Sequence, residues 1–149
     1  MNSHHTVAIG TWEGDKQQSI EYNSSIAVGI DCPRAKLRVS ILLDTIQEYQ
    51  VRYIFSDEEI SEAVNEAGLI IGARGIAYEG VLQRKPVIVE GEYGFGGLVT
   101  PDTLHEQYNN YFRGKINGIK AEYFSLERLE EEIRRGFALT FQELQMMSN

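Results

Sequence analysis

Residues 69–89 read LIIGARGIAYEGVLQRKPVIV, and this stretch decides the fold. The apolar runs 69–71 and 87–89 are typical of strands inside a parallel sheet that is covered on both faces. Between these runs the sequence predicts a glycine-containing turn, a brief helix that opens on Glu79 and a second strand that begins at Pro86. Sheets of this kind bind ligands at the carboxyl ends of their strands. We expect these residues at that edge: Gly72, Ala73, Arg74, Gly75 and Glu79.

The alternation of strand and helix continues toward the amino terminus. Residues 26–30 and 51–55 are short apolar runs that predict strands. Residues 34–49 carry apolar side chains at three- and four-residue spacing, which predicts an amphipathic helix. Ser56 and Glu59 have the spacing of a capping box, and they open a helix that Gly68 ends. The predicted fold class is α/β, a doubly wound parallel sheet of the Rossmann-like type.

Four further elements are expected beyond residue 89. Residues 90–99 contain four glycines and predict a loop whose backbone can approach a ligand closely. Thr100 and Pro101 suit the cap and first residue of a helix that reaches Gly114. The dipeptide Asn117-Gly118 favours a hairpin turn. Residues 126–144 form one apolar stripe, which predicts a single closing helix.

The chain of 149 residues has the length of one domain. Residues 1–25 form an irregular N-terminal strand and loop segment in this prediction. Within it, residues 6–10 alternate toward a strand, and a loop or irregular hairpin follows. Residues 26–149 form the Rossmann-like domain.

Composition excludes several classes of protein. The net charge of −8 repels a phosphate backbone, so we expect no nucleic-acid partner. No apolar run has the roughly 20 residues of a transmembrane helix, and a signal sequence is not recognisable, so we expect a cytoplasmic protein. Cys32 is the single cysteine, which excludes a thiolate metal cluster, and the pair His4-His5 fits a plain terminus better than a metal site.

Two runs carry a resemblance to a known family. Residues 72–80, GARGIAYEG, and residues 84–89, RKPVIV, place Glu79 seven positions before Pro86. This pattern resembles the C-terminal, nucleotide-sugar-binding domain of GT-B glycosyltransferases and of the UDP-N-acetylglucosamine 2-epimerase superfamily. The chain departs from the pattern at Arg74, where a small residue is usual, and at Arg84, where glycine is frequent. It also contains only one of the two domains that a GT-B enzyme needs.

The resemblance implies a function and a set of binding residues. The donor would be a nucleotide-diphosphate sugar, with UDP as the nucleotide, bound as substrate without a further cofactor for polysaccharide or glycoconjugate synthesis. Glu79 would hold the ribose hydroxyls, and a partner domain or subunit would bind the acceptor. No catalytic residue and no metal ligand is assigned. The implied nucleotide-sugar-binding residues are Arg74, Gly75, Ile76, Glu79, Gly94, Phe95, Gly96 and Gly97.

Two alternatives stay open at this point. One is a non-catalytic module that binds a nucleotide or sugar phosphate. The other is an α/β interaction protein in which Arg74 and Glu79 merely pair with each other. Two residue-level alternatives also remain: Tyr93 and Phe95 either stack on a base or sugar or fill the core, and His105 is a solvated helix residue or a general base.

Overall fold

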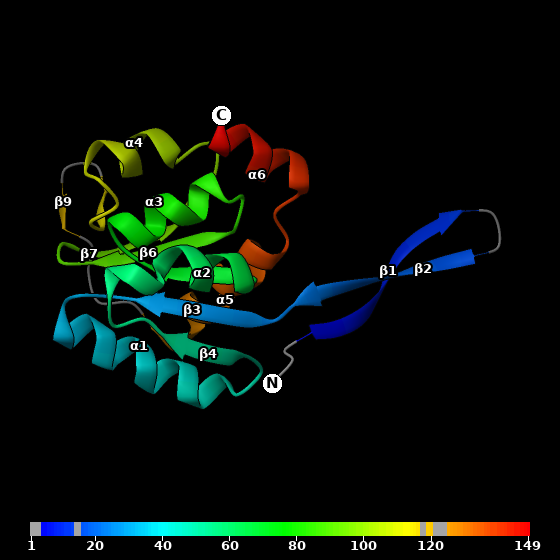
Figure 1. Ribbon diagram of the computed structural model, residues 1–149, viewed down its shortest axis with the longest axis horizontal. Coiled ribbons are helices and arrows are strands. Elements are labelled where there is room, and N and C mark those ends of the chain that lie inside the picture. Colours follow the sequence, from blue (N-terminus) through cyan, green and yellow to red (C-terminus); the bar gives the residue numbers. More distant parts are fainter. Residues whose placement is uncertain (1–3, 14–15, 117–118, 121–124) are drawn as a thin grey trace.

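The computed structural model describes residues 4–13, 16–116, 119–120 and 125–149, with side chains for residues 23–115 and 125–149. In this part of the chain the body is a five-stranded sheet with the order β4-β3-β5-β6-β7 (Figure 1). Strands β3 to β6 run parallel, whereas β7 is antiparallel to β6. The strands are β3 (Ser25–Gly29), β4 (Gln50–Tyr53), β5 (Leu69–Gly72), β6 (Val87–Gly91) and β7 (Gly94–Leu98).

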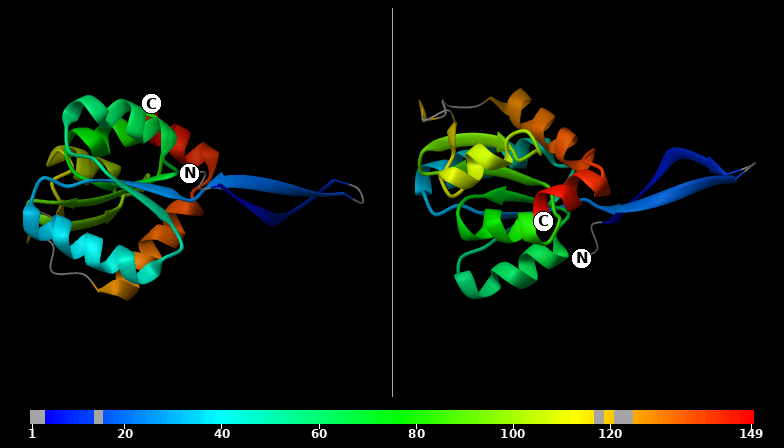
Figure 2. Two further views of the ribbon diagram at one scale, coloured as in Figure 1. Left: turned by 60° about the horizontal axis from the view of Figure 1, so that its bottom comes forward. Right: turned by 90° about the horizontal axis from the view of Figure 1, so that it is seen from above.

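Helices cover both faces of the sheet, as the views in Figure 2 show. On one face Val39 of α1 and Ile133 of α5 pack against Ile71 and Ile88 of the sheet. On the other face α2, α3 and α6 pack around the opposite side chains of the same strands, including Ile70. The helices are α1 (Pro33–Ile46), α2 (Ile60–Glu66), α3 (Gly75–Leu82), α4 (Leu104–Asn109), α5 (Leu126–Phe137) and α6 (Phe141–Ser148), with a 3₁₀ turn η1 (Asp57–Glu59) before α2.

The expected α/β class is therefore confirmed, with a mostly parallel sheet flanked by helices. Every residue of β5 and of β6 is buried, which explains the apolar runs 69–71 and 87–89 in the sequence. The predicted helix 34–49 corresponds to α1, and the predicted strands 26–30 and 51–55 correspond to β3 and β4. Ser56 precedes η1, where its hydroxyl lies 3.2 Å from the Glu59 carboxylate but makes no capping bond to the backbone.

Four predicted elements differ from the structure. Helix α3 begins at Gly75, one turn earlier than the expected opening at Glu79. The glycine-rich segment is strand β7, because the β6–β7 pairing satisfies its backbone, whereas a loop was expected. The closing helix is broken at Ala138 and restarts as α6, where Thr140 forms a capping box with Glu143. Helix α4 ends at Asn109, since Tyr111 and Phe112 both have a φ of 55°.

The amino-terminal segment forms an antiparallel hairpin of β1 (His4–Glu13) and β2 (Lys16–Asn23), which extends away from the body (Figure 1). Of the two readings that the sequence left open, the irregular hairpin is the one observed. The register of β1 shifts between Ala8 and Thr11. A second small hairpin joins β8 (Lys115–Ile116) to β9 (Ile119–Lys120), and the predicted Asn-Gly turn at 117–118 lies outside the described residues.

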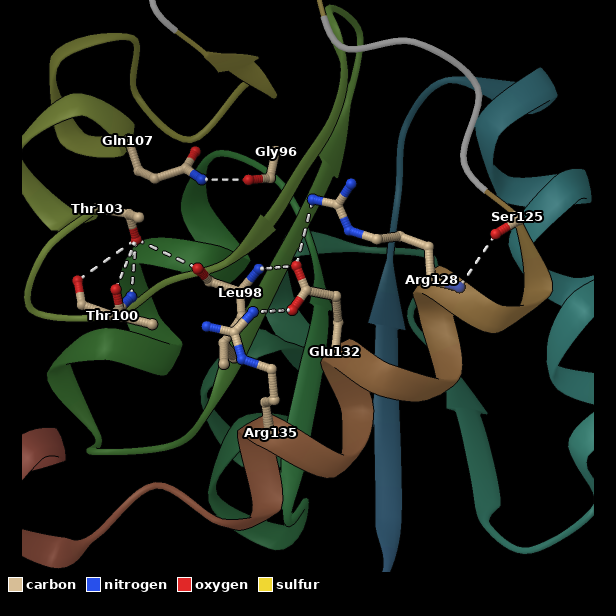
Figure 3. A network of polar contacts seen from close by, with 9 residues as sticks. All are labelled: Gly96, Leu98, Thr100, Thr103, Gln107, Ser125, Arg128, Glu132 and Arg135. Atoms are coloured by element: carbon tan, nitrogen blue, oxygen red, sulfur yellow. Dashed lines mark hydrogen bonds and ion pairs between the residues drawn. The ribbon is translucent and has the colours of Figure 1, made fainter.

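Side chains from both faces bind the outer edge of β7 (Figure 3). From α4, the Gln107 amide donates a 2.7 Å hydrogen bond to the Gly96 carbonyl. From α5, the buried Glu132 carboxylate accepts the Leu98 N–H at 3.4 Å and an ion pair from Arg135 at 2.7 Å. Unpaired strand edges invite pairing with other chains. These contacts satisfy one backbone acceptor and one donor of β7.

Candidate functional site

The strand order reverses at β3, because the chain passes from β3 outward to β4 and then back across to β5 on the other side. In open α/β sheets this switch point leaves a crevice at the carboxyl ends of the strands, where ligands bind. A cavity of about 320 Å³ lies at this place. We call it the switch-point cavity. Its lining includes Gly29 and Asp31 after β3, Phe55, Ser56 and Asp57 after β4, Ala73, Arg74, Gly75 and Ile76 after β5, and Tyr111.

Arg74 holds the most unusual backbone conformation in the site. It is the residue before α3, with φ 55° and ψ −126°, a region that residues with a Cβ seldom occupy. Its N–H donates to the Phe112 carbonyl at 3.1 Å, and its guanidinium forms an ion pair with Glu92. This pair raises the pKa of Arg74 above its usual value. Backbone strain of this kind concentrates at functional sites, so Arg74 is the leading candidate for a ligand contact.

A second guanidinium shares the same carboxylate. Arg113 Nε lies 3.3 Å from the Glu92 oxygen, and its guanidinium lies 5.9 Å from the centre of the Tyr93 ring. Two arginines thus lie around one carboxylate at the carboxyl edge of the sheet. Such a pair of planar donors suits a phosphate or carboxylate group of a ligand.

Gly75 opens α3 next to Arg74, and its backbone faces open space. A Cβ atom built at Gly75 has no neighbouring atom within 4 Å. The first N–H groups of a helix have no partner within the helix, and the helix dipole favours an anion there. The amino end of α3 and the Arg74 guanidinium therefore give the cavity one wall that attracts negative charge.

The rest of the wall combines aromatic rings with carboxylates. The Phe55 side chain is 76% exposed, and the Lys36 ammonium lies 4.0 Å from the centre of its ring. Tyr111 is 47% exposed and lines the same cavity. Exposed rings offer faces on which a planar group can stack. Asp31 and Asp57 supply carboxylates that accept hydrogen bonds from hydroxyl groups.

A smaller cavity of about 250 Å³ lies next to the first, toward β6. Asp31, Ala73 and Arg74 line both cavities, while Cys32, Gly91 and Glu92 line the smaller one only. Arg74 thus lies between two adjoining hollows. The two cavities suit a ligand with two parts, one in each cavity, that are joined by a negatively charged group beside Arg74.

Glu79 lies apart from the switch-point cavity. It belongs to the second turn of α3, where its carboxylate accepts a 2.7 Å hydrogen bond from the Gln83 amide. The same amide lies 3.2 Å from the Ser61 carbonyl, so Glu79 is turned toward α2. The alternative that Arg74 pairs with Glu79 is not what the structure shows, because the Arg74 guanidinium binds Glu92.

The glycines of β7 have structural partners. Gly94 pairs with Gly91 at the carboxyl edge, whereas Gly96 and Gly97 lie further along the strand, beside Gln107 and Glu132. Phe95 is 3% exposed and belongs to the core around α5, so it fills the core. His105 is exposed on α4, which agrees with the expectation of a solvated helix residue.

Of the eight binding residues that the resemblance implied, Arg74, Gly75 and Ile76 line the cavity, and Ala73, which was expected at the same edge, lines it too. The sequence prediction missed the residues after β3 and β4. Their position after predicted strands is the signal that could have found them, because Asp31 directly follows the predicted strand 26–30 and Asp57 lies two residues after the predicted strand 51–55. Tyr111 had no such signal, since it reaches the cavity through a turn with positive φ beyond α4.

These features define an α/β protein with a cavity at the switch point of its sheet. The chain matches no protein-family model, and comparisons with curated proteins and with solved structures find no match. In the described residues no group of three or more His, Cys, Asp and Glu side chains is placed to hold a metal ion. The same residues include no helix with the length and apolar character needed to cross a bilayer.

Proposed function

We propose that this chain is the donor-binding domain of a GT-B-like glycosyltransferase and holds a nucleotide-diphosphate sugar, with UDP as the nucleotide, in a doubly wound Rossmann-like fold. The observation that carries the proposal is the strained Arg74 at the amino end of α3, where it separates two adjoining cavities at the switch point. The sequence pattern of residues 72–89 supports the same class.

In this proposal Arg74 and the first N–H groups of α3 bind the diphosphate, because both attract a doubly charged group. The nucleoside lies in the larger cavity, where Phe55 and Tyr111 stack on the base. During glycosyl transfer the same groups stabilise the departing diphosphate. A partner domain or subunit orients the acceptor and supplies any base, so the chain by itself binds donor and scarcely turns it over.

A second candidate is a non-catalytic module that binds a nucleotide or sugar phosphate. The Glu92 carboxylate favours this candidate, since it already neutralises part of the charge of Arg74 and Arg113. A site with weakened positive charge fits reversible binding better than stabilisation of a leaving group. The two candidates share the ligand and differ in whether an acceptor-binding partner produces turnover.

The test is a thermal-shift panel of UDP, GDP, ADP and CMP with their common sugar conjugates. A ligand at about a hundred times its dissociation constant adds about 2.7 kcal/mol to the stability of the folded state, which is a shift of several degrees for a domain of this size. The wild type is compared with Arg74→Met and with Arg84→Met. Arg84 is a matched control, because it is also an exposed arginine with positive φ (60°) and lies outside the cavity.

We expect one nucleoside diphosphate family to stabilise the wild type and Arg84→Met, and Arg74→Met to lose most of the response. A panel without any shift rules out both candidates. Glu79→Ala separates the sequence pattern from the geometry. Loss of ribonucleotide binding in Glu79→Ala assigns the ribose contact to Glu79, whereas an unchanged response leaves that contact to Asp31 or Asp57.

A further inference from the structure

The hairpin of β1 and β2 lies outside the body of the protein. It extends away from the sheet and the helices in all the views (Figures 1 and 2). Among the described residues, its two strands pair with each other in a separate two-stranded sheet and with no strand of the body. A two-stranded hairpin alone is at best marginally stable in water, and a third strand or a packing surface is needed to hold it. The hairpin therefore needs a further strand or a packing surface for its stability.

The root of the hairpin is fixed to the body. The Asn23 amide donates to the Glu66 carbonyl, and the Asn23 side-chain oxygen accepts the Ser25 N–H at 2.9 Å. The Gly68 N–H donates to the Ser25 carbonyl at 2.9 Å. A Cβ at Gly68 would lie 1.8 Å from the Asn23 carbonyl oxygen, so the two segments are in direct contact. These bonds set the direction in which the hairpin leaves the body.

The two open edges of the hairpin differ in sequence. Residues 4–12 of β1 contain no Lys, Arg, Asp, Glu or Pro, whereas β2 contains Lys16 and Glu21. Charged residues and proline are the usual means by which proteins keep an exposed strand from pairing with another chain. The β1 edge lacks these residues along nearly its whole length. It is the edge that is open to a further strand.

We propose that the β1 strands of two copies of this chain pair antiparallel across a two-fold axis and form a four-stranded sheet. An antiparallel strand edge is complementary to itself under such an axis. Pairing centred on Ile9 sets His5 of one copy opposite Glu13 of the other, so the single acidic residue of β1 does not meet a second one. This pairing extends each hairpin to the sheet size that a stable structure needs.

The geometry leaves the switch-point cavity free. Strand β3 starts next to the root of the hairpin and ends at the carboxyl edge, so the two features lie at opposite ends of the body (Figure 1). The dimer therefore presents its two cavities outward. The proposal does not depend on what the cavity binds.

Two measurements on the full chain test the dimer. Light scattering coupled to size exclusion gives the mass, for which we expect twice the 16.9 kDa of the monomer. Disulfide cross-linking then locates the contact. In a Cys32→Ser background, cysteine is introduced singly at Val7, Ala8 and Ile9, near the middle of β1. At least one of these variants should give a covalent dimer on mild oxidation, since disulfides form when the Cα atoms lie within about 7 Å.

Ser19→Cys is the matched control, because Ser19 is the cross-strand partner of Ala8 on β2. In the proposed sheet the two copies of this position are three strand spacings apart, about 14 Å, which is beyond the reach of a disulfide. A monomeric mass overturns the proposal. So does a dimer that cross-links through Ser19→Cys, or through none of the three β1 positions.

Discussion

Glu90 provides a direct test of the electrostatics at the end of β6. Its side chain is 3% exposed, and burial raises its pKa from 4.5 to about 7, although the positive charge of Arg38 acts in the opposite direction. The folded protein therefore keeps a proton on Glu90 at pH values where the unfolded chain has lost it. Ionisation of this carboxyl group destabilises the fold.

The magnitude follows from the two pKa values. A rise from 4.5 to about 7 corresponds to about 3 kcal/mol, at roughly 1.4 kcal/mol for each pKa unit. The sign follows from proton binding. Because the folded pKa is raised, the contribution to stability is fully present below about pH 4.5 and decreases as the pH rises. It is lost once the pH has passed the folded pKa of about 7.

The perturbation is Glu90→Gln, which keeps the shape of the side chain and removes its titration. Urea unfolding at a series of pH values from about 5 to about 8.5 gives the free energy of unfolding of both proteins. We expect the variant to gain about 2 to 3 kcal/mol relative to the wild type across this range. Glu131→Gln, at an exposed position of α5, is the control and should follow the wild type. A constant difference between Glu90→Gln and the wild type at every pH would refute the reasoning.

Three further predictions concern the stability of the fold. Glu132→Ala removes the acceptor of a buried N–H on β7 and should lower the free energy of unfolding by about 2 kcal/mol, whereas Glu131→Ala should change it little. Equal effects of the two substitutions in urea unfolding would contradict a role of Glu132 in stabilising the edge of β7. Gly68→Ala places a Cβ 1.8 Å from a backbone oxygen and should destabilise by at least about 2 kcal/mol. Gly75→Ala meets no atom within 4 Å and should stabilise α3 by roughly 0.5 to 1 kcal/mol, and a loss of stability there would contradict the open geometry of the site.

The sequence by itself determined the elements of the body. Apolar runs located β3, β5 and β6, and the spacing of apolar residues located α1, because these patterns are properties of a local segment with one buried side. Local patterns predicted secondary structure less well in glycine-rich segments. The segment Gly94–Leu98 reads as a loop by composition and is a strand, since its pairing partner β6 supplies the hydrogen bonds. The break between α5 and α6 was likewise hidden beneath a continuous apolar stripe.

The residues of the candidate site also fall into two groups, those that the sequence identified and those that only the structure revealed. The sequence alone identified Arg74 and Gly75, because strand, turn and helix are contiguous there. Only the tertiary structure decided which residues join them. The strand order brings Asp31 and Asp57 to the same cavity, and a turn with positive φ brings Tyr111 across from beyond α4. The tertiary structure also decided that Glu79 accepts a hydrogen bond from Gln83 and that Arg74 forms its ion pair with Glu92. The physical reason is that a cavity is formed by segments that are distant in the chain, and their meeting depends on the order of the strands in the sheet.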